Sequence, residues 1–108
     1  MTTEAAYLYL TTTGHKTGKM HEIEIWFVFD RGCYYLISEH GEHAHWVQNI
    51  RAHPAVNWRV GSRTAEEIHG TGHVVTEVDE PDTVASVSAL MDAKYGWSEG
   101  LIVGLCPD

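Results

Sequence analysis

The side chains best suited to bind a ligand lie in a short segment near the N-terminus. Thr13 and Thr17 carry hydroxyl groups, Lys16 carries a positive charge, and Gly14 and Gly18 bracket the turn between them. A glycine-bracketed turn after a strand points several backbone N–H groups into one concavity, and the hydroxyl and ammonium groups add further donors. The pattern predicts a site for a phosphate or another small anion, with a solvated turn as the alternative.

Two histidines, His15 and His21, flank Lys16 and Lys19 and make this segment the only locally positive one. The chain as a whole has a formal net charge of −8, from 7 Lys and Arg against 15 Asp and Glu. Such a surface repels nucleic acid, because affinity there comes mostly from neutralising phosphates. We therefore expect a small-molecule partner and no nucleic acid.

Other histidines and both cysteines could suggest a metal or redox site. His43 and His45 belong to the sequence His-Gly-Glu-His-Ala-His, but at the entry to a helix they would diverge by about 200° around the axis. We expect a solvated, histidine-rich loop there and no metal. Cys33 and Cys106 form no CxxC pair, and we expect two reduced, partly buried thiols of a cytoplasmic protein rather than a disulfide.

The elements that must position these residues are mostly strands. Aromatic and β-branched enrichment predicts strands at 5–13, 21–30, 33–38, 56–60, 65–78 and 101–105, while helical spacing predicts helices at 43–53 and from 79 to Gly96. The run Trp26-Phe27-Val28-Phe29 indicates a strand that becomes covered on both faces. This order predicts one domain, residues 1–108, built as a small antiparallel barrel. We expect no signal peptide and no membrane span.

Two motifs carry a family resemblance. Residues 10–18, LTTTGHKTG, resemble the LTTTGRKSG opening of the deazaflavin (coenzyme F420)-dependent nitroreductase family, a branch of the split β-barrels related to pyridoxamine phosphate oxidases. Residues 45–56 resemble its WYLNLRANPRV segment, and Met91 and Tyr95 resemble the start of its MYPxY segment. The resemblance covers roughly residues 9 to 95. It implies a mainly β (α+β) fold, a six-stranded, Greek-key-like antiparallel split β-barrel with two short helices.

The same resemblance implies a cofactor and a set of site residues. The cofactor is coenzyme F420, and the turn would hold its phosphate region. The implied cofactor-binding residues are Thr13, His15, Lys16, Thr17, His21, Trp26, Ser38, Trp46 and Asn49. Ser38 would lie near the ring, and Tyr95 would lie on the substrate side, so these two are the catalytic candidates.

Departures from the family pattern leave alternatives open. The family commonly has arginine where this chain has His15 and His21, and lysine where it has Glu39. It usually has Pro-Leu where this chain reads Glu24-Ile25. Coenzyme F420 is polyanionic, so these replacements remove favourable Coulomb interactions of about 1 kcal/mol each when exposed. FMN or haem in the same fold, or a non-catalytic module that binds a flavin-like ligand, are the alternatives.

A reduced deazaflavin donates hydride from its own ring, so no nucleophile–base pair is required of the protein. The resemblance therefore implies an oxidoreductase that transfers hydride to a quinone, an enone or a nitro compound. The chain has four tryptophans for one small core, and we expect Trp58 and Trp97 in that core or in a dimer interface. We predict a homodimer that buries roughly 800 Å² or more per partner.

Overall fold

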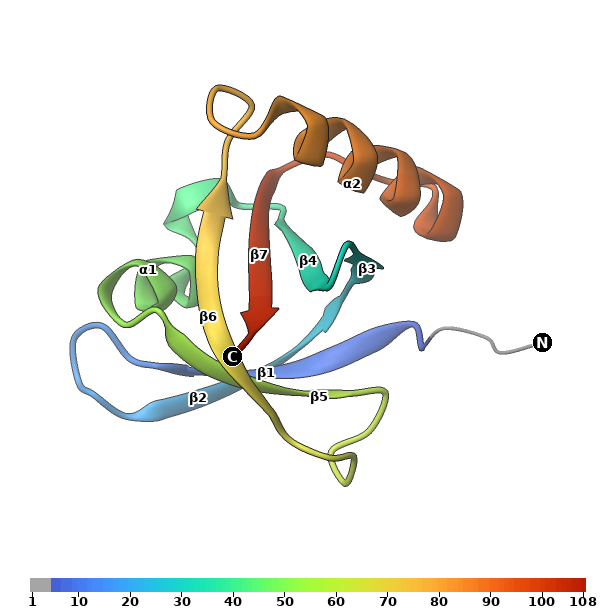
Figure 1. Ribbon diagram of the computed structural model, residues 1–108. Helices are drawn as coiled ribbons and strands as arrows, with labels where there is room; N and C mark the ends of the chain where they lie inside the picture. The colour runs from blue at the N-terminus through green and yellow to red at the C-terminus, as the bar shows by residue number, and fades with distance from the viewer. Residues whose placement is uncertain (1–4) are drawn as a thin grey trace.

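The computed structural model describes residues 5–108 (Figure 1). The elements in chain order are β1 (Tyr7–Thr13), β2 (Met20–Trp26), β3 (Val28–Asp30), β4 (Cys33–Ser38), a 3-10 turn (Gly41–His43), α1 (His45–Ala52), β5 (Ala55–Val60), β6 (Ile68–Val75), α2 (Pro81–Tyr95) and β7 (Leu101–Pro107). The predicted helix at 43–53 thus begins two residues late, after the 3-10 turn, and the predicted strand at 65–78 is shorter at both ends. No helix in the described range is long and apolar enough to cross a membrane.

The strands form one antiparallel sheet in the order β2-β1-β5-β6-β7-β4-β3. The two end strands, β2 and β3, are consecutive in the chain and are separated only by Phe27. The curved sheet therefore closes into a barrel through the chain itself. The predicted strand at 21–30 is this bent β2–β3 segment, which explains why seven strands are found where six were expected. The expected split-barrel architecture is confirmed.

The bend at Phe27 is held by the end of α2. The Phe27 N–H donates to the Tyr95 hydroxyl at 3.1 Å, and the Phe27 carbonyl accepts from that hydroxyl at 2.8 Å and from Lys94 Nζ at 2.9 Å. Lys94 Nζ also lies 4.1 Å from the centre of the Phe27 ring. A buried backbone needs a partner for each polar group, and here side chains of α2 supply what a neighbouring strand otherwise would.

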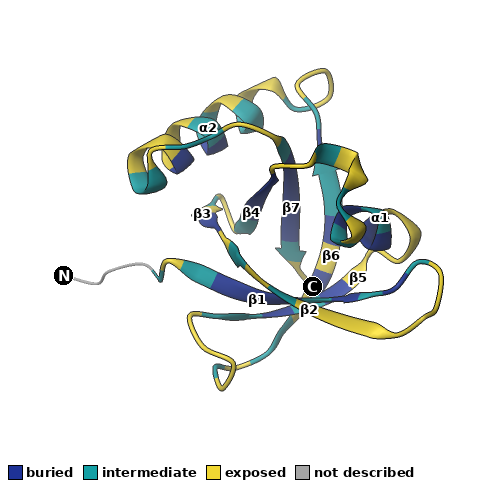
Figure 2. Ribbon diagram, turned by 180° about the vertical axis from the view of Figure 1, so that it is seen from behind, coloured by how far each residue is buried: buried dark blue, intermediate teal, exposed yellow. Residues whose placement is uncertain are grey.

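Two hydrophobic cores lie on opposite faces of the curved sheet. The core inside the barrel consists of Leu8, Leu10, Phe27, Leu36, Val47, Ile50, Val56, Trp58, Val103 and Leu105. The second core lies between the sheet and α2 and consists of Val28, Tyr35, Ile37, Val75, Val87, Met91 and Ile102. Figure 2 shows the resulting pattern, with the buried side of α2 turned toward β3, β4 and β7 and its outer side exposed. Phe27 and Val28 thus point into different cores, whereas Trp26 and Phe29 are each 47% exposed, so only the middle of the apolar run is covered on both faces.

The two cysteines form a disulfide, so the expectation of two reduced thiols is wrong. Cys33 and Cys106 are separated by 73 residues in sequence, but their Cα atoms are 4.5 Å apart. The β4–β7 register pairs Tyr34 with Leu105, which places the cysteines opposite each other one step further along. Only this register, which no local pattern reveals, brings them together.

Candidate functional site

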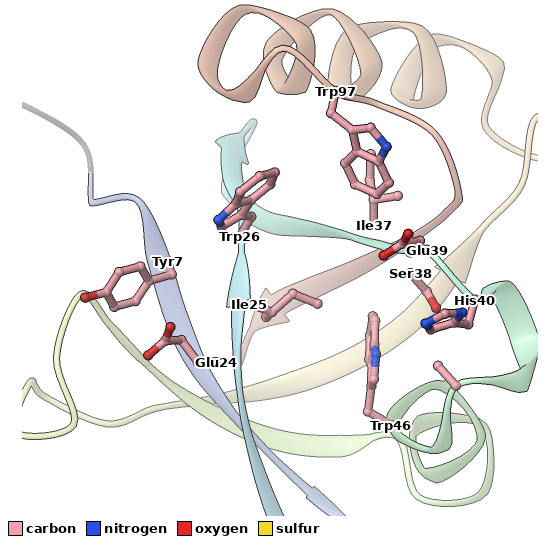
Figure 3. A pocket seen from close by; sticks show the side chains of 11 residues that line it. Tyr7, Glu24, Ile25, Trp26, Ile37, Ser38, Glu39, His40, Trp46 and Trp97 are labelled. Atoms are coloured by element: carbon pink, nitrogen blue, oxygen red, sulfur yellow. The ribbon is translucent and has the colours of Figure 1, made fainter.

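The larger of two adjoining cavities lies where the barrel wall is open. We call it the gap pocket; it has a volume of about 600 Å³ and is lined by Tyr7, Glu24, Ile25, Trp26, Ile37, Ser38, Glu39, His40, Ala44, Trp46 and Trp97 (Figure 3). Its two sides come from β2 and from the end of β4, strands that do not pair with each other. The bend at Phe27 joins the two end strands, which closes the barrel. It also leaves β2 unpaired with β4, and this creates the gap.

Three indole rings give the gap pocket its apolar walls. Figure 3 shows Trp26 and Trp97 toward one end of the pocket and Trp46 at the other. Trp26 is 47% exposed, yet its ring is fixed by a parallel stack on Tyr95, with centroids 4.4 Å apart, and by an edge contact with Trp97 at 6.3 Å. Flat aromatic walls of this kind suit a flat ligand, because stacking adds to the burial of apolar surface.

Polar groups in the gap pocket are few, and two of them are carboxylates. Ser38 is buried, and its hydroxyl donates to the Gly41 carbonyl at 2.8 Å, which leaves the oxygen as an acceptor toward the pocket. Glu24 accepts a hydrogen bond from the Tyr9 hydroxyl at 3.0 Å. Burial, followed by this contact with Glu24, raises the pKa of Tyr9 to about 12, so Tyr9 stays protonated at any ordinary pH. Tyr7, Glu39 and His40 complete the set, and within residues 5–108 no lysine or arginine lines the pocket.

Tyr95 does not line the gap pocket, and its placement does not fit the catalytic role that the resemblance implied. Its ring lies behind Trp26, and its hydroxyl contacts the carbonyls of Ala6 and Phe27 and the N–H of Phe27. Every polar contact of that hydroxyl is therefore to the backbone. Tyr95 supports the wall of the pocket.

The second cavity, the loop pocket, has a volume of about 430 Å³ and is lined by Thr12, Gly14, His15, Lys16, Thr17, His21, Glu22, Ile23, His45, Trp46, Gln48 and Asn49. It adjoins the gap pocket, because Trp46 lines both. The turn beside it is closed by hydrogen bonds from Gly14 N to Lys19 O (2.7 Å) and from Gly18 N to Gly14 O (2.9 Å). Gly18 has a φ of +73°, which a residue with a side chain rarely adopts.

A buried amide on α1 fixes this turn to the helix. Asn49 Oδ1 accepts the backbone N–H of His15 at 2.9 Å and contacts His15 Nδ1 at 2.7 Å, while Asn49 Nδ2 donates to Thr12 Oγ1 at 3.0 Å. Asn49 is 3% exposed, so these partners use most of its hydrogen-bonding capacity. Asn49 lines the loop pocket, and its contacts make it an anchor for the loop.

The structure brings together most of the residues predicted for cofactor binding. Trp26, Ser38 and Trp46 line the gap pocket, and His15, Lys16, Thr17, His21, Trp46 and Asn49 line the loop pocket. Thr13 lines neither, because strand alternation turns Thr12 inward with Leu8 and Leu10, whereas Thr13 Oγ1 contacts Met20. That alternation was readable in the sequence and would have selected Thr12.

Sequence reasoning also missed several lining residues. Trp97 packs against the second core, as expected, but it is also a wall of the gap pocket, which was not expected; Trp58 is fully buried as expected. His45, expected in a solvated loop, lines the loop pocket. Within residues 5–108, no three His, Cys, Asp or Glu side chains are grouped as metal ligands.

Comparison with known proteins identifies the family. The model of the F420H(2)-dependent quinone reductase family matches residues 2–96. No curated protein sequence matches the chain. Among solved structures, an F420-H2-dependent reductase is 21% identical, with a TM-score of 0.61 and 97% of each chain covered. An F420 reductase is 18% identical, with a TM-score of 0.69, covering 97% of this chain and 88% of that one.

The heme storage protein HutZ from Vibrio cholerae is 17% identical, with a TM-score of 0.76, covering 97% of this chain and 83% of that one. At these identities the structural matches show a common fold, and the family model carries the function. The chain belongs to the F420H(2)-dependent quinone reductase family, and it is an oxidoreductase that uses coenzyme F420.

Proposed function

We propose that this enzyme reduces a flat, uncharged acceptor of the quinone class in the gap pocket. The observation that carries the proposal is the junction of the two cavities at Trp46. An indole-walled slot continues there into a hollow lined by Lys16, three imidazoles and a hydroxyl. A ligand with a flat ring and an anionic tail matches both halves. An enone or a nitro compound would fit the same slot and is the alternative acceptor.

The residues present suit coenzyme F420. Trp26, Trp46 and Ser38 would hold its ring, with the Ser38 oxygen as an acceptor for a donor on that ring. Lys16 and the Thr17 hydroxyl would contact the phosphodiester in the loop pocket. His15 and His21 line the same pocket and complete the proposed set.

When bound, the reduced cofactor supplies the hydride. The protein's own contribution is then to orient the two flat molecules and to exclude water from between them. The indoles of Trp26 and Trp97 serve both purposes, because they present apolar surface that is already fixed before a ligand arrives. We propose that Tyr95 positions Trp26 and takes no part in the chemistry.

The test is a binding and turnover assay on the purified protein. Fluorescence quenching should report coenzyme F420 binding, with FMN, FAD and haem titrated in parallel. Oxidation of the reduced cofactor, followed by absorbance, should be faster with a naphthoquinone than with a nitroarene or a cyclic enone at equal concentration. Tight binding of FMN or haem without binding of coenzyme F420 would contradict the cofactor assignment, and equal rates for the three acceptors would contradict the quinone preference.

We also propose that the enzyme is a homodimer. Trp26 and Met20, both well exposed on β2, support an interface on this side of the barrel. Light scattering at tens of micromolar protein should give twice the monomer mass. A monomer mass at that concentration would contradict the proposal.

A further inference from the structure

The loop pocket has an unusual set of charges for a site that faces an anion. Its titratable lining residues are His15 and Lys16 from the turn, His21 and Glu22 from β2, and His45 from α1. The Glu22 carboxylate accepts from Arg63 Nε at 2.8 Å, so its charge is offset by a neighbour. Among the described residues, Lys16 is the only side chain lining this pocket whose positive charge does not depend on pH near neutrality. The remaining positive charge must come from three imidazoles.

The hydrogen bonds of Asn49 define which atom of His15 titrates. The atom that accepts the backbone N–H of His15 must be an oxygen, and the same oxygen lies 2.7 Å from His15 Nδ1. Because that oxygen only accepts, Nδ1 carries its hydrogen whether or not the ring is charged. Proton uptake by His15 therefore occurs at Nε2, which changes from a lone pair into a donor.

The other two imidazoles are placed by the turn and by the helix. A Cβ atom at Gly14 would lie 3.0 Å from both His21 Nε2 and Thr17 Oγ1, so these two polar atoms converge on the same point of the turn. The ring of His45 meets the ring of His15 edge-on, with centroids 6.4 Å apart. The two imidazoles therefore border the same part of the loop pocket, where one anion could contact both.

Resting on the function proposed above, we propose that the loop pocket takes up protons when it binds the anionic end of the cofactor. A neutral imidazole offers a lone pair to an anion, whereas a protonated one offers a donor and a charge. The bound anion therefore favours the protonated rings, and binding tightens as pH falls through the range where these rings take up protons. Each proton taken up contributes at most a tenfold change in affinity per pH unit. Lys16 supplies the part of the affinity that is independent of pH.

The experiment compares two ligands between pH 5.5 and 8.5. One is coenzyme F420, and the other is its deazariboflavin fragment, which has the same ring but neither the phosphodiester nor the glutamate tail. The ratio of the two dissociation constants cancels any titration of the ring. We expect the dissociation constant of the fragment divided by that of coenzyme F420 to be about tenfold larger at pH 5.5 than at pH 8.5. Calorimetry in two buffers of different ionisation enthalpy should show net proton uptake for the full cofactor and less for the fragment.

Variants test whether the three histidines cause the pH dependence. The triple variant His15→Gln, His21→Gln, His45→Gln should remove the pH dependence of the ratio and leave the affinity for the fragment unchanged. His69→Gln is the matched control, because His69 lies on β6, pairs with Glu67 and lines neither pocket. A flat ratio in the parent protein, or an unchanged slope in the triple variant, would overturn this proposal while the proposed function stands. Failure of both ligands to bind at any pH would overturn the two together.

Discussion

The two pockets differ in what holds their walls in place. The gap pocket is built from apolar rings that stack on one another and on the end of α2, whereas the loop pocket is a polar turn attached to α1 by one buried amide. Affinity in the first would come from shape and buried area, which respond little to pH or salt. Affinity in the second would come from charge, which responds to both. One ligand that spans the two would therefore be held by forces that can be changed separately.

The largest expected effect is on stability, and it should leave the affinities of both pockets unchanged. Replacing both cysteines (Cys33→Ser with Cys106→Ser) opens a loop of 73 residues and should lower the free energy of unfolding by about 4 kcal/mol. The bridge joins β4 and β7 at the end remote from Ser38, so neither pocket should change its affinity. Urea unfolding with and without reductant measures the first effect, and titration below the transition measures the second. Equal stability of parent and variant under oxidising conditions would show that the bridge does not form in solution.

Removal of the Tyr95 ring should affect the gap pocket alone. Tyr95→Leu loses the stack on Trp26 and should cost about 3 kcal/mol of stability, with roughly tenfold weaker binding of the deazariboflavin fragment. Tyr95→Phe keeps the stack and loses only the hydrogen bonds to the backbone, at a cost of about 1 to 2 kcal/mol.

The pair of Tyr95 variants separates positioning from catalysis. If Tyr95 positions Trp26, Tyr95→Phe should keep the fragment affinity and the turnover number measured at saturating acceptor. Loss of turnover in Tyr95→Phe with unchanged binding would instead assign the hydroxyl to the chemistry.

Asn49→Ala tests the loop pocket by removing its anchor. The backbone N–H and the ring of His15 both lose their acceptor, so we expect about tenfold weaker binding of coenzyme F420 and no change for the fragment. Gln48→Ala is the matched control, because Gln48 lines the same pocket but bonds to the carbonyls of Glu42 and His43. An equal loss for both ligands would mean that Asn49 supports the barrel as a whole.

The smallest effect concerns charge selection in the gap pocket. Glu39 is exposed at its rim, and Glu39→Lys should lower the KM for a sulfonated naphthoquinone about threefold relative to a neutral one. The preference should weaken as salt is added. An unchanged ratio of the two KM values would place the acceptor away from Glu39.

The sequence was informative where function depends on local pattern. The glycine-bracketed turn, the helix that carries Trp46 and Asn49, and the run from Trp26 to Phe29 all lie where the pattern predicted them. Each of these signals is confined to a few consecutive residues. The alternation of β1 is equally local, and it places Thr12 rather than Thr13 at the loop pocket.

Other features depend on pairings across the chain that no local pattern contains. Cys33 meets Cys106 through the β4–β7 register, and Phe27 meets Tyr95 across 68 residues. Asn49 was recognised as a polar lining residue, but a single sequence does not show which partners its amide has. The roles of Tyr95 and Asn49 as supports for other residues therefore became visible only once their contacts were known.

The open seam between β2 and β4 also determines how the barrel can deform. Elsewhere in the sheet, moving two neighbouring strands apart breaks a ladder of hydrogen bonds, whereas widening this seam breaks none. Side chains at the end of α2, Lys94 and Tyr95, hold the Phe27 bend at one end of the seam, and Ile23 and Ile25 of β2 pack on the core inside the barrel. The width of the gap pocket is thus set by side-chain packing and not by a hydrogen-bond ladder, so we expect substitutions at this helix end to change the size of the ring that the pocket accepts without redesigning the sheet.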